Sequence, residues 1–240
     1  MIAPPGRPAY RPPPMVRLVL FDIDGTLVHT GGAGVRAFAT VFATEFGAHG
    51  AERLRFAGRT DVSLVREFFQ WNGIPETAEN FARFFDRYVF WLDHILAHSR
   101  TEECPGVRAL IHELEALPEP PLVGLLTGNV RLGAEIKLRH FGLWEHFVTG
   151  GFADDHEDRD QIAAVAKRRG ERLLGRPLAG REILVVGDTP LDIRCGRAIG
   201  ARVLAVATGG ARAEELARHH PDRLVEDVRG LRAAQLCGRE

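Results

Sequence analysis

The feature of this sequence that most constrains its fold is a set of short runs rich in valine, leucine and isoleucine. The clearest runs cover residues 16–21, 122–126, 183–186 and 203–207, and weaker candidates cover 147–149 and 223–225. Helical patterns lie between them, over residues 107–117, 132–141, 161–174 and 191–199. Near-continuous apolar strands that alternate with helices predict an α/β fold, with a parallel sheet covered on both faces.

One region interrupts this alternation. From residue 33 to residue 100 the sequence has helical periodicity and no convincing strand, and it is rich in aromatic residues. Their spacing suits the faces of helices that pack on one another. Because the region follows the first strand directly, we expect a helical module inserted after that strand. Gly31, Gly32 and Gly34 precede it and suit a flexible hinge, but they lack the GxGxxG spacing of a dinucleotide site.

These patterns predict three parts. Residues 1–14 contain six of the fourteen prolines, so we expect a proline-rich tail outside the fold rather than a helix or central strand. Residues 15–31 and 101–240 would form the sheet-containing core domain. Residues 32–100 would form the helical cap domain.

Composition excludes several classes of function. The formal net charge is −1, with no long basic run, so nothing indicates a nucleic-acid partner. No apolar stretch approaches the length of a membrane span. The three cysteines, Cys104, Cys195 and Cys237, show no CxxC pairing, which favours unpaired thiols in a reducing compartment. We therefore expect a cytoplasmic protein.

Unusual residues follow three of the predicted strands. In open parallel sheets, ligands bind beyond the carboxyl ends of the strands. Converging carboxylates repel one another unless a cation neutralises them, and ligation by oxygen alone favours Mg²⁺. A hydroxyl beside backbone amides suits an anionic oxygen. The residues in question are Asp22 and Asp24 after the first strand, Thr127, Gly128 and Asn129 after the second, and Asp188 and Asp192 after a later one.

Three motifs in this order resemble the haloacid dehalogenase-like hydrolase superfamily, and specifically its phosphatases with a helical cap after the first strand. The pattern hhhhDxDGT[LV] is matched by LVLFDIDGTL, hhh[ST] by LLTGN, and GDxxxD by GDTPLDI. Together they span residues 16–192. The resemblance implies a Rossmann-like, doubly wound core and a Mg²⁺-dependent phosphatase that acts on a small-molecule phosphate ester.

The resemblance also implies a role for each motif residue. Asp22 would attack phosphorus and form an aspartyl-phosphate, and Asp24 would protonate the leaving alcohol and later deprotonate water. The Asp22 carboxylate, the Asp24 backbone carbonyl and Asp188 would hold Mg²⁺, and Asp192 would either bind the ion directly or support its ligands. The phosphate oxygens would be held by Thr127, Gly128, Asn129 and Lys137.

The sequence departs from the superfamily pattern at its lysine, because many relatives carry it in a KP dipeptide that is absent here. Two lysines remain in the interval, Lys137 and Lys167. We prefer Lys137, which lies on the helix that leaves the TGN turn, because Lys167 lies in a basic helical stretch that suggests a solvated face. Arg159 is a lesser candidate for the same electrostatic role.

The cap is expected to set specificity. The segment Phe56–Asp61 resembles the cap loop that reaches the site in related enzymes, and within it Arg59 and Thr60 are candidate substrate contacts. Arg59 suits a substrate carboxylate or a second phosphate. The alternative is an ordinary helix start, with Thr60 or Asp61 as the N-cap. Phosphoglycolate is the substrate that the resemblance suggests, by analogy alone.

Two other functions remain open at this stage. A phosphomutase of the same fold would return the phosphoryl group to a sugar phosphate instead of water, and the motifs do not separate the two reactions. A non-enzymatic interaction protein on a decayed scaffold is less favoured, because decay would remove Asp22, Asp24 or Asp188, and all three are present. The chain is expected to be a monomer or a homodimer.

Overall fold

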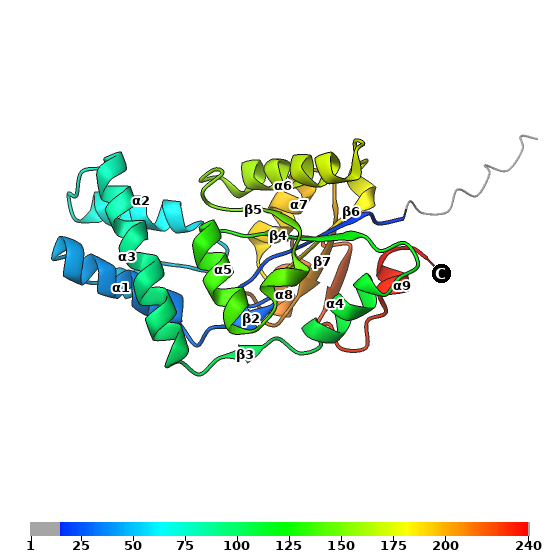
Figure 1. The fold of residues 1–240 in the computed structure, drawn as a ribbon, viewed down its shortest axis with the longest axis horizontal. Helices are drawn as coiled ribbons and strands as arrows, with labels where there is room; N and C mark the ends of the chain where they lie inside the picture. Colours follow the sequence, from blue (N-terminus) through cyan, green and yellow to red (C-terminus); the bar gives the residue numbers. More distant parts are fainter. Residues whose placement is uncertain (1–14, 240) are drawn as a thin grey trace, which may run out of the picture.

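The structure, a computed structural model, describes residues 15–239, so the predicted proline-rich tail of residues 1–14 lies outside the described residues. Its centre is a six-stranded sheet, all parallel, in the order β5-β4-β1-β6-β7-β8 (Figure 1). The strands are β1 (Leu18–Phe21), β4 (Leu122–Leu126), β5 (Thr149–Gly151), β6 (Ile183–Gly187), β7 (Arg202–Val206) and β8 (Arg223–Val225).

This order confirms the doubly wound α/β core. The chain runs outward from β1 to β4 and β5, then returns to β6 on the other side of β1 and runs outward again. The order therefore reverses at β1, and in such sheets the crevice at the reversal point is where ligands bind. The fold places that crevice between the carboxyl ends of β1 and β6.

Helices cover both faces of the sheet. One face carries α4 (Val107–Glu115), α5 (Arg131–His140) and α9 (Ala233–Leu236), and the other carries α6 (Arg159–Leu174) and α7 (Pro190–Ala198). The short helix α8 (Ala213–Ala217) follows β7, and the single-turn helices are η1 (Ala51–Arg53), η2 (Trp144–His146) and η3 (Gly180–Glu182). Among residues 15–239, none of the helices combines the length and the apolar content that crossing a bilayer requires.

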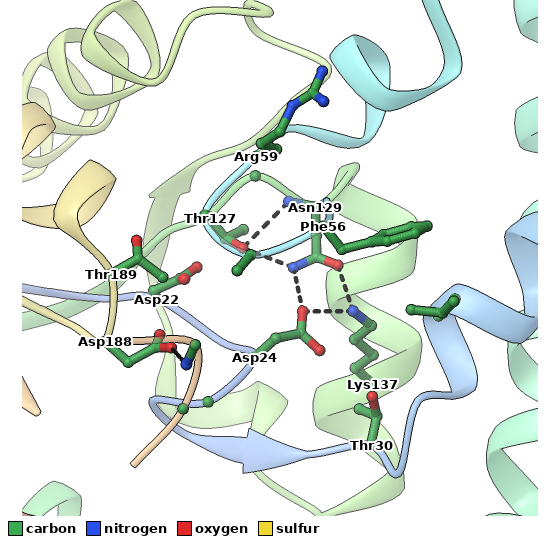
Figure 2. Close-up of a pocket in the computed structure, with 18 of the residues that line it drawn as sticks. Asp22, Asp24, Thr30, Phe56, Arg59, Thr127, Asn129, Lys137, Asp188 and Thr189 are labelled. Carbon is green, nitrogen blue, oxygen red and sulfur yellow. Dashed lines mark hydrogen bonds and ion pairs between the residues drawn. The ribbon is translucent and has the colours of Figure 1, made fainter. Parts of the chain in front are cut away.

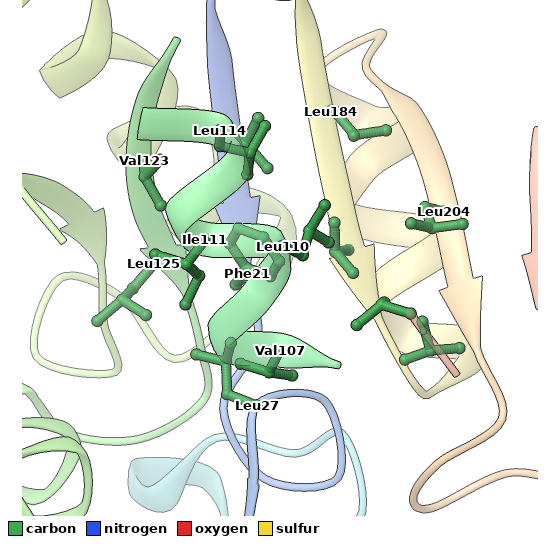
Figure 3. Packing of buried hydrophobic residues seen from close by; sticks show 14 of the residues in the cluster. Phe21, Leu27, Val107, Leu110, Ile111, Leu114, Val123, Leu125, Leu184 and Leu204 are labelled. Carbon is green, nitrogen blue, oxygen red and sulfur yellow. The ribbon is translucent and has the colours of Figure 1, made fainter. Parts of the chain in front are cut away.

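The alternation of side chains along β1 builds the two apolar layers. Val19 and Phe21 face the cluster beneath α4, whose Leu110 and Ile111 pack over the strands (Figure 3). Leu18 and Leu20 point the other way, into the cluster with α6 and α7. All four strand residues are almost fully buried, so β1 has apolar side chains on both faces, as a central parallel strand requires.

The weak strand candidate at residues 147–149 was misplaced, because β5 begins only at Thr149. Phe147 instead follows the single turn η2, and its ring meets that of Phe21 edge-on, with centroids 6.3 Å apart. Its apolar character serves packing on the core rather than strand pairing. Periodicity in the sequence cannot separate these two uses of an aromatic residue.

The expected helices are present between residues 33 and 97. They are α1 (Ala33–Phe46), α2 (Asp61–Trp71) and α3 (Ala78–Ala97), and they extend to one side of the sheet (Figure 1). Their shared faces enclose an apolar cluster that is distinct from those of the sheet. Phe42 lies at its centre, with its ring centroid 4.1 Å from that of Phe68 and 4.5 Å from that of Phe84.

A feature that the sequence did not indicate joins the helical segment to the sheet. The strands β2 (Val28–His29) and β3 (Glu102–Glu103) form an antiparallel ribbon, with Val28 opposite Glu103 and His29 opposite Glu102. The chain therefore leaves and re-enters the core at one place. Each strand has only two residues, which is too short for alternation to be recognised in a sequence.

The first prediction concerns the aromatic cluster of the helical segment. Phe42→Ala should lower the free energy of unfolding by about 3–5 kcal/mol, because a fully buried ring is replaced by a cavity. Denaturant titration followed by circular dichroism measures this. The matched control is Phe90→Ala on α3, where the ring is 61% exposed and the loss should stay below about 1 kcal/mol. Equal losses in the two variants would contradict the assignment of the cluster.

Candidate active site

The strand ends that carry the motif residues meet at one pocket. It has a volume of about 430 Å³ and lies beyond the carboxyl ends of the strands, against the helical segment. Asp22 follows β1, Asp188 follows β6, and Thr127 follows β4, so the crevice predicted from the strand order is lined by all three (Figure 2). The reversal of the strand order at β1 thus explains why residues far apart in the sequence share one cavity.

The turn after β1 sets the direction of its two aspartates. The carbonyl of Ile23 accepts hydrogen bonds from the amides of Thr26, Leu27 and Val28, which folds the chain back sharply. Gly25 has a φ of +80°, and a Cβ there would lie 2.6 Å from Asp188 Oδ2. Glycine is therefore required at this position for both its conformation and its lack of volume.

Three carboxylates gather at the floor of the pocket. Asp22, Asp188 and Asp192 are buried, and each offers a carboxylate oxygen within 4.8 Å of the others. Burial, followed by the charge of Asp192, raises the pKa of Asp188 above its ordinary value. Burial also raises the pKa of Asp22, although the guanidinium of Arg159 opposes the effect. When all three acids are ionised, the single charge of Arg159 offsets only part of their negative charge.

The two other acids of this cluster have different partners. Asp188 Oδ1 accepts a hydrogen bond from Thr26 Oγ1 at 2.9 Å, and its Oδ2 contacts the amide of Gly210. Asp192 Oδ2 accepts from the amide of Thr189 at 2.9 Å and from its hydroxyl at 2.6 Å, which caps α7. Its Oδ1 pairs with Arg159. Asp188 thus has one partner on each oxygen and lines the pocket, whereas Asp192 has two donors on one oxygen and Arg159 on the other and does not line it.

Asp24 belongs to a second network on the opposite wall. Its Oδ2 accepts hydrogen bonds from Lys137 Nζ at 2.6 Å and from Asn129 Nδ2 at 2.9 Å. Lys137 Nζ also donates to Asn129 Oδ1 at 2.6 Å, which closes a three-residue ring of contacts (Figure 2). Burial tends to raise the pKa of Asp24. The charge of Lys137 and these hydrogen bonds outweigh that effect and hold the pKa below its ordinary value.

Arg159 occupies the position beside Asp22. Its side chain is buried, with Nη2 3.7 Å from Asp22 Oδ1, and it pairs with Asp192. Sequence reasoning ranked Lys137 above Arg159 as the basic residue of the site, and the structure brings both to the pocket. Lys137 meets Asp24, whereas Arg159 meets Asp22. Lys167, the third candidate, does not line the pocket.

The TGN turn supports the loop from the helical segment. Thr127 Oγ1 accepts hydrogen bonds from the amide of Asn129 at 3.3 Å and from its side chain at 2.8 Å. A Cβ at Gly128 would lie 2.1 Å from the carbonyl oxygen of Arg59, so glycine alone allows this loop to lie on the turn. The amide of Asp61 donates to the Gly128 carbonyl at 2.7 Å and fixes the contact.

Arg59 and Thr60, the two cap residues expected to contact substrate, have their side chains engaged with other protein groups. Arg59 lines the pocket, but its guanidinium pairs with Glu67 and points away from Asp22 and Asp24 (Figure 2). The structure therefore does not bring it to the carboxylates. Thr60 is the N-cap of α2, where its hydroxyl accepts from the amide of Ser63 at 3.3 Å and donates to the Glu157 carbonyl at 2.9 Å.

Sequence reasoning missed two contributors to the site. Asp61 is buried and lines the pocket, with Oδ2 accepting from the amide of Val130 at 2.8 Å, and burial raises its pKa to about 7. The loop after β7 also closes over the first turn, through Gly210 on Asp188 and Thr208 Oγ1 on the Gly25 carbonyl. The sequence held a signal for each, since Thr208-Gly209-Gly210 follows a predicted strand directly and Asp61 ends the Phe56–Asp61 segment, but neither signal gave the residue a part in the site.

Comparisons with known proteins agree with this geometry. A family model described as haloacid dehalogenase-like hydrolase matches residues 19–197. Phosphoglycolate phosphatase from Yersinia pseudotuberculosis is 29% identical over 215 residues, which cover 86% of this chain and 88% of that protein. CbbY from Rhodobacter sphaeroides, solved with phosphate, has a TM-score of 0.71 at 21% identity, covering 90% of this chain and 96% of the other. A Bacteroides vulgatus protein with a provisional β-phosphoglucomutase assignment has a TM-score of 0.67 at 20% identity, covering 94% of this chain and 89% of that protein.

The second prediction follows from the buried carboxylates. Asp22 and Asp188 have folded-state pKa values above their ordinary 3.8, so the unfolded state loses its protons first as pH rises. Stability should therefore fall with rising pH, from about pH 4 into the neutral range. In chelator, the Tm from scanning calorimetry should be lower at about pH 8 than at about pH 5, and Mg²⁺ should reverse the loss at the higher pH. Asp188→Asn should reduce the change of Tm with pH. An unchanged difference between about pH 5 and about pH 8 in that variant would contradict the role of Asp188 in it.

Proposed function

The chain belongs to the haloacid dehalogenase-like hydrolase family, and from this premise we propose that the enzyme is a Mg²⁺-dependent phosphatase of small-molecule phosphate monoesters. The observation that carries the proposal is the convergence of Asp22, Asp24 and Asp188 with the TGN turn in one pocket. A phosphate held there would lie between a carboxylate nucleophile, a candidate proton donor and a set of positive or hydrogen-bond-donating groups.

The donor set fits a hard divalent cation. Asp22 and Asp188 supply carboxylate oxygens from adjacent strand ends, and no histidine or cysteine joins the cluster of acids around them within residues 15–239. Oxygen-only ligands are those that Mg²⁺ takes in proteins, usually together with water and substrate phosphate. We infer that Asp22 and Asp188 hold the ion and that Asp192 acts by orienting Arg159 and capping α7. When bound, Mg²⁺ would neutralise the carboxylates and polarise a phosphoryl oxygen.

Asp22 would be the nucleophile. Attack by one of its carboxylate oxygens forms an oxygen–phosphorus bond as the bond to the leaving alcohol breaks, which gives an aspartyl-phosphate. Attack requires the ionised carboxylate, whereas burial favours the protonated form. The guanidinium of Arg159, 3.7 Å from Asp22 Oδ1, favours the ionised form and lies where it can hold the carboxylate in one orientation.

Asp24 would serve as the proton donor and acceptor. It must give a proton to the leaving alcohol, yet its contacts with Lys137 and Asn129 favour the ionised form. We infer that the substrate phosphate draws Lys137 and Asn129 to its own oxygens, which releases Asp24 and lets its pKa rise. In the second step Asp24 accepts a proton from the water that attacks phosphorus, as the bond to Asp22 breaks.

We further propose that the substrate is a small ester such as phosphoglycolate. Phosphoglycolate is supported by the similarity to the Yersinia phosphatase and is the first ester to test. A pocket of about 430 Å³ suits a small ester. Arg59 pairs with Glu67, so recognition of a substrate carboxylate by Arg59 would require that pair to open. Apolar residues, including Phe38 and Phe56, line the helical side and would leave limited room for a large polar group.

The third prediction tests the reaction. With Mg²⁺, the wild-type chain should release inorganic phosphate from at least one ester in a panel that includes phosphoglycolate and uncharged-alcohol phosphates. Asp22→Asn should lower turnover by roughly 10³-fold or more, because the nucleophile is lost. Asp24→Asn should lower it by about 10²–10⁴-fold, because the leaving alkoxide lacks a proton. Chelation should abolish turnover in all variants.

The same assay separates the alternatives. Transfer of the phosphoryl group between positions of a sugar phosphate, with little release of inorganic phosphate, would indicate a mutase instead. No turnover on any ester by a chain with a normal circular dichroism spectrum would contradict the phosphatase proposal. Activity that survives in Asp22→Asn would contradict the covalent mechanism while leaving the reaction class intact.

The fourth prediction separates the two basic residues. Arg159→Met should lower kcat by about 10²-fold or more, because Asp22 loses its nearest positive charge. Lys137→Met should raise KM and move the pH–rate limb that reports Asp24 to higher pH, because the lysine charge no longer lowers that pKa. Steady-state kinetics across pH measures both effects, with Lys167→Met as the control that should change neither. A fall in kcat in Lys137→Met, with no change in KM or in the pH–rate limb, would contradict the assignment of Lys137 to Asp24.

A further inference from the structure

We propose that His112, Glu115 and His146 form a second metal site, for a transition-metal dication such as Zn²⁺, on the surface of the core. None of the three lines the pocket described above. The site would be independent of the phosphatase chemistry, since it shares no residue with the acidic cluster.

The three side chains come from two elements of the fold. His112 and Glu115 lie three residues apart on α4, so they project from the same side of that helix. His146 is the last residue of η2, the turn that precedes β5. Each offers a ligand atom, and these atoms all lie within 4.8 Å of one another. The imidazole rings of His112 and His146 have centroids 5.4 Å apart.

The chemistry of these donors differs from that of the pocket. Two imidazole nitrogens and one carboxylate oxygen are a ligand set that proteins use for Zn²⁺ and that Cu²⁺ and Ni²⁺ also accept. Mg²⁺ instead requires oxygen ligands, as at Asp22 and Asp188. The two sites would therefore select different ions on the same chain, according to the softness of their donors.

Exposure leaves room for a metal and its remaining ligands. His112 is exposed, and the side chains of Glu115 and His146 are 42% and 21% exposed. Water can therefore complete a tetrahedral shell. His146 Nδ1 already lies 2.7 Å from Glu115 Oε1, and a metal would replace that hydrogen bond with two coordination bonds. The imidazole would then carry its proton on Nε2, and its tautomer would be fixed by the metal.

A metal held in this way would fasten α4 to the turn after α5. Both elements pack against the same apolar layer of the sheet, through Ile111 on α4 and Trp144 in η2. Binding to the folded state alone raises stability by mass action, so Zn²⁺ should raise the Tm of the chain. This effect provides a readout that does not depend on phosphatase activity.

The fifth prediction is a metal-binding measurement on the full chain, stripped with chelator and then kept in excess Mg²⁺ to occupy the acidic pocket. Isothermal titration with Zn²⁺ should give one site per chain. His146→Ala and Glu115→Gln should each weaken binding by about 10-fold or more and remove the rise in Tm. Co²⁺ bound at this site should show the intense visible absorption of tetrahedral nitrogen ligation, and His146→Ala should lose it.

Two controls locate the ion. His98→Ala alters the other close pair of imidazoles, His94 and His98 on α3, whose centroids are 5.0 Å apart, and it should leave Zn²⁺ binding unchanged. Asp188→Asn alters the acidic pocket and should also leave it unchanged. The proposal is overturned if wild type binds no Zn²⁺ in Mg²⁺, if His146→Ala binds as wild type does, or if either control variant loses the site.

Discussion

The mutual repulsion of Asp22, Asp188 and Asp192 is the constraint on which the rest of the site depends. The sheet forces these acids together, because the carboxyl ends of neighbouring parallel strands open onto the same crevice. Arg159 supplies one buried positive charge, which pairs with Asp192 and lies near Asp22. Among residues 15–239 no other basic side chain pairs with these three acids, so a bound cation would offset the charge that remains.

Lys137 supplies a second buried positive charge, on the opposite wall of the pocket. It pairs with Asp24, so each aspartate of the first motif has its own basic partner, supplied by a different helix: Lys137 by α5 and Arg159 by α6. Placing the two cations apart keeps the environments of Asp22 and Asp24 different. Both cations favour the ionised carboxylate, which suits the role proposed for Asp22, whereas Asp24 in its proposed role would take up a proton only after Lys137 turns to the substrate phosphate.

The sequence allowed much of this arrangement to be predicted, because its signals were local. Apolar runs that end in acids identified β1 and β6, a run that ends in Thr127 identified β4, and the strand-end rule then placed Asp22, Thr127 and Asp188 together. The ranking of Lys137 over Arg159 rested on distance along the chain, whereas the contacts of Arg159 with Asp22 depend on how α6 crosses the sheet. Likewise, the sequence placed Asp61 in the cap loop or at the helix start, but it could not show that the carboxylate is buried and accepts from the amide of Val130.

The ribbon of β2 and β3 has a consequence for how such a protein can change over time. Val28 lies directly opposite Glu103, so the polypeptide leaves and rejoins the sheet-containing core at adjacent points. A segment whose two ends are neighbours can be lengthened, shortened or exchanged without displacing the strands it interrupts. The 72 or so intervening residues are therefore a natural unit of recombination, by which a lineage could acquire a new selectivity while inheriting its catalytic residues intact.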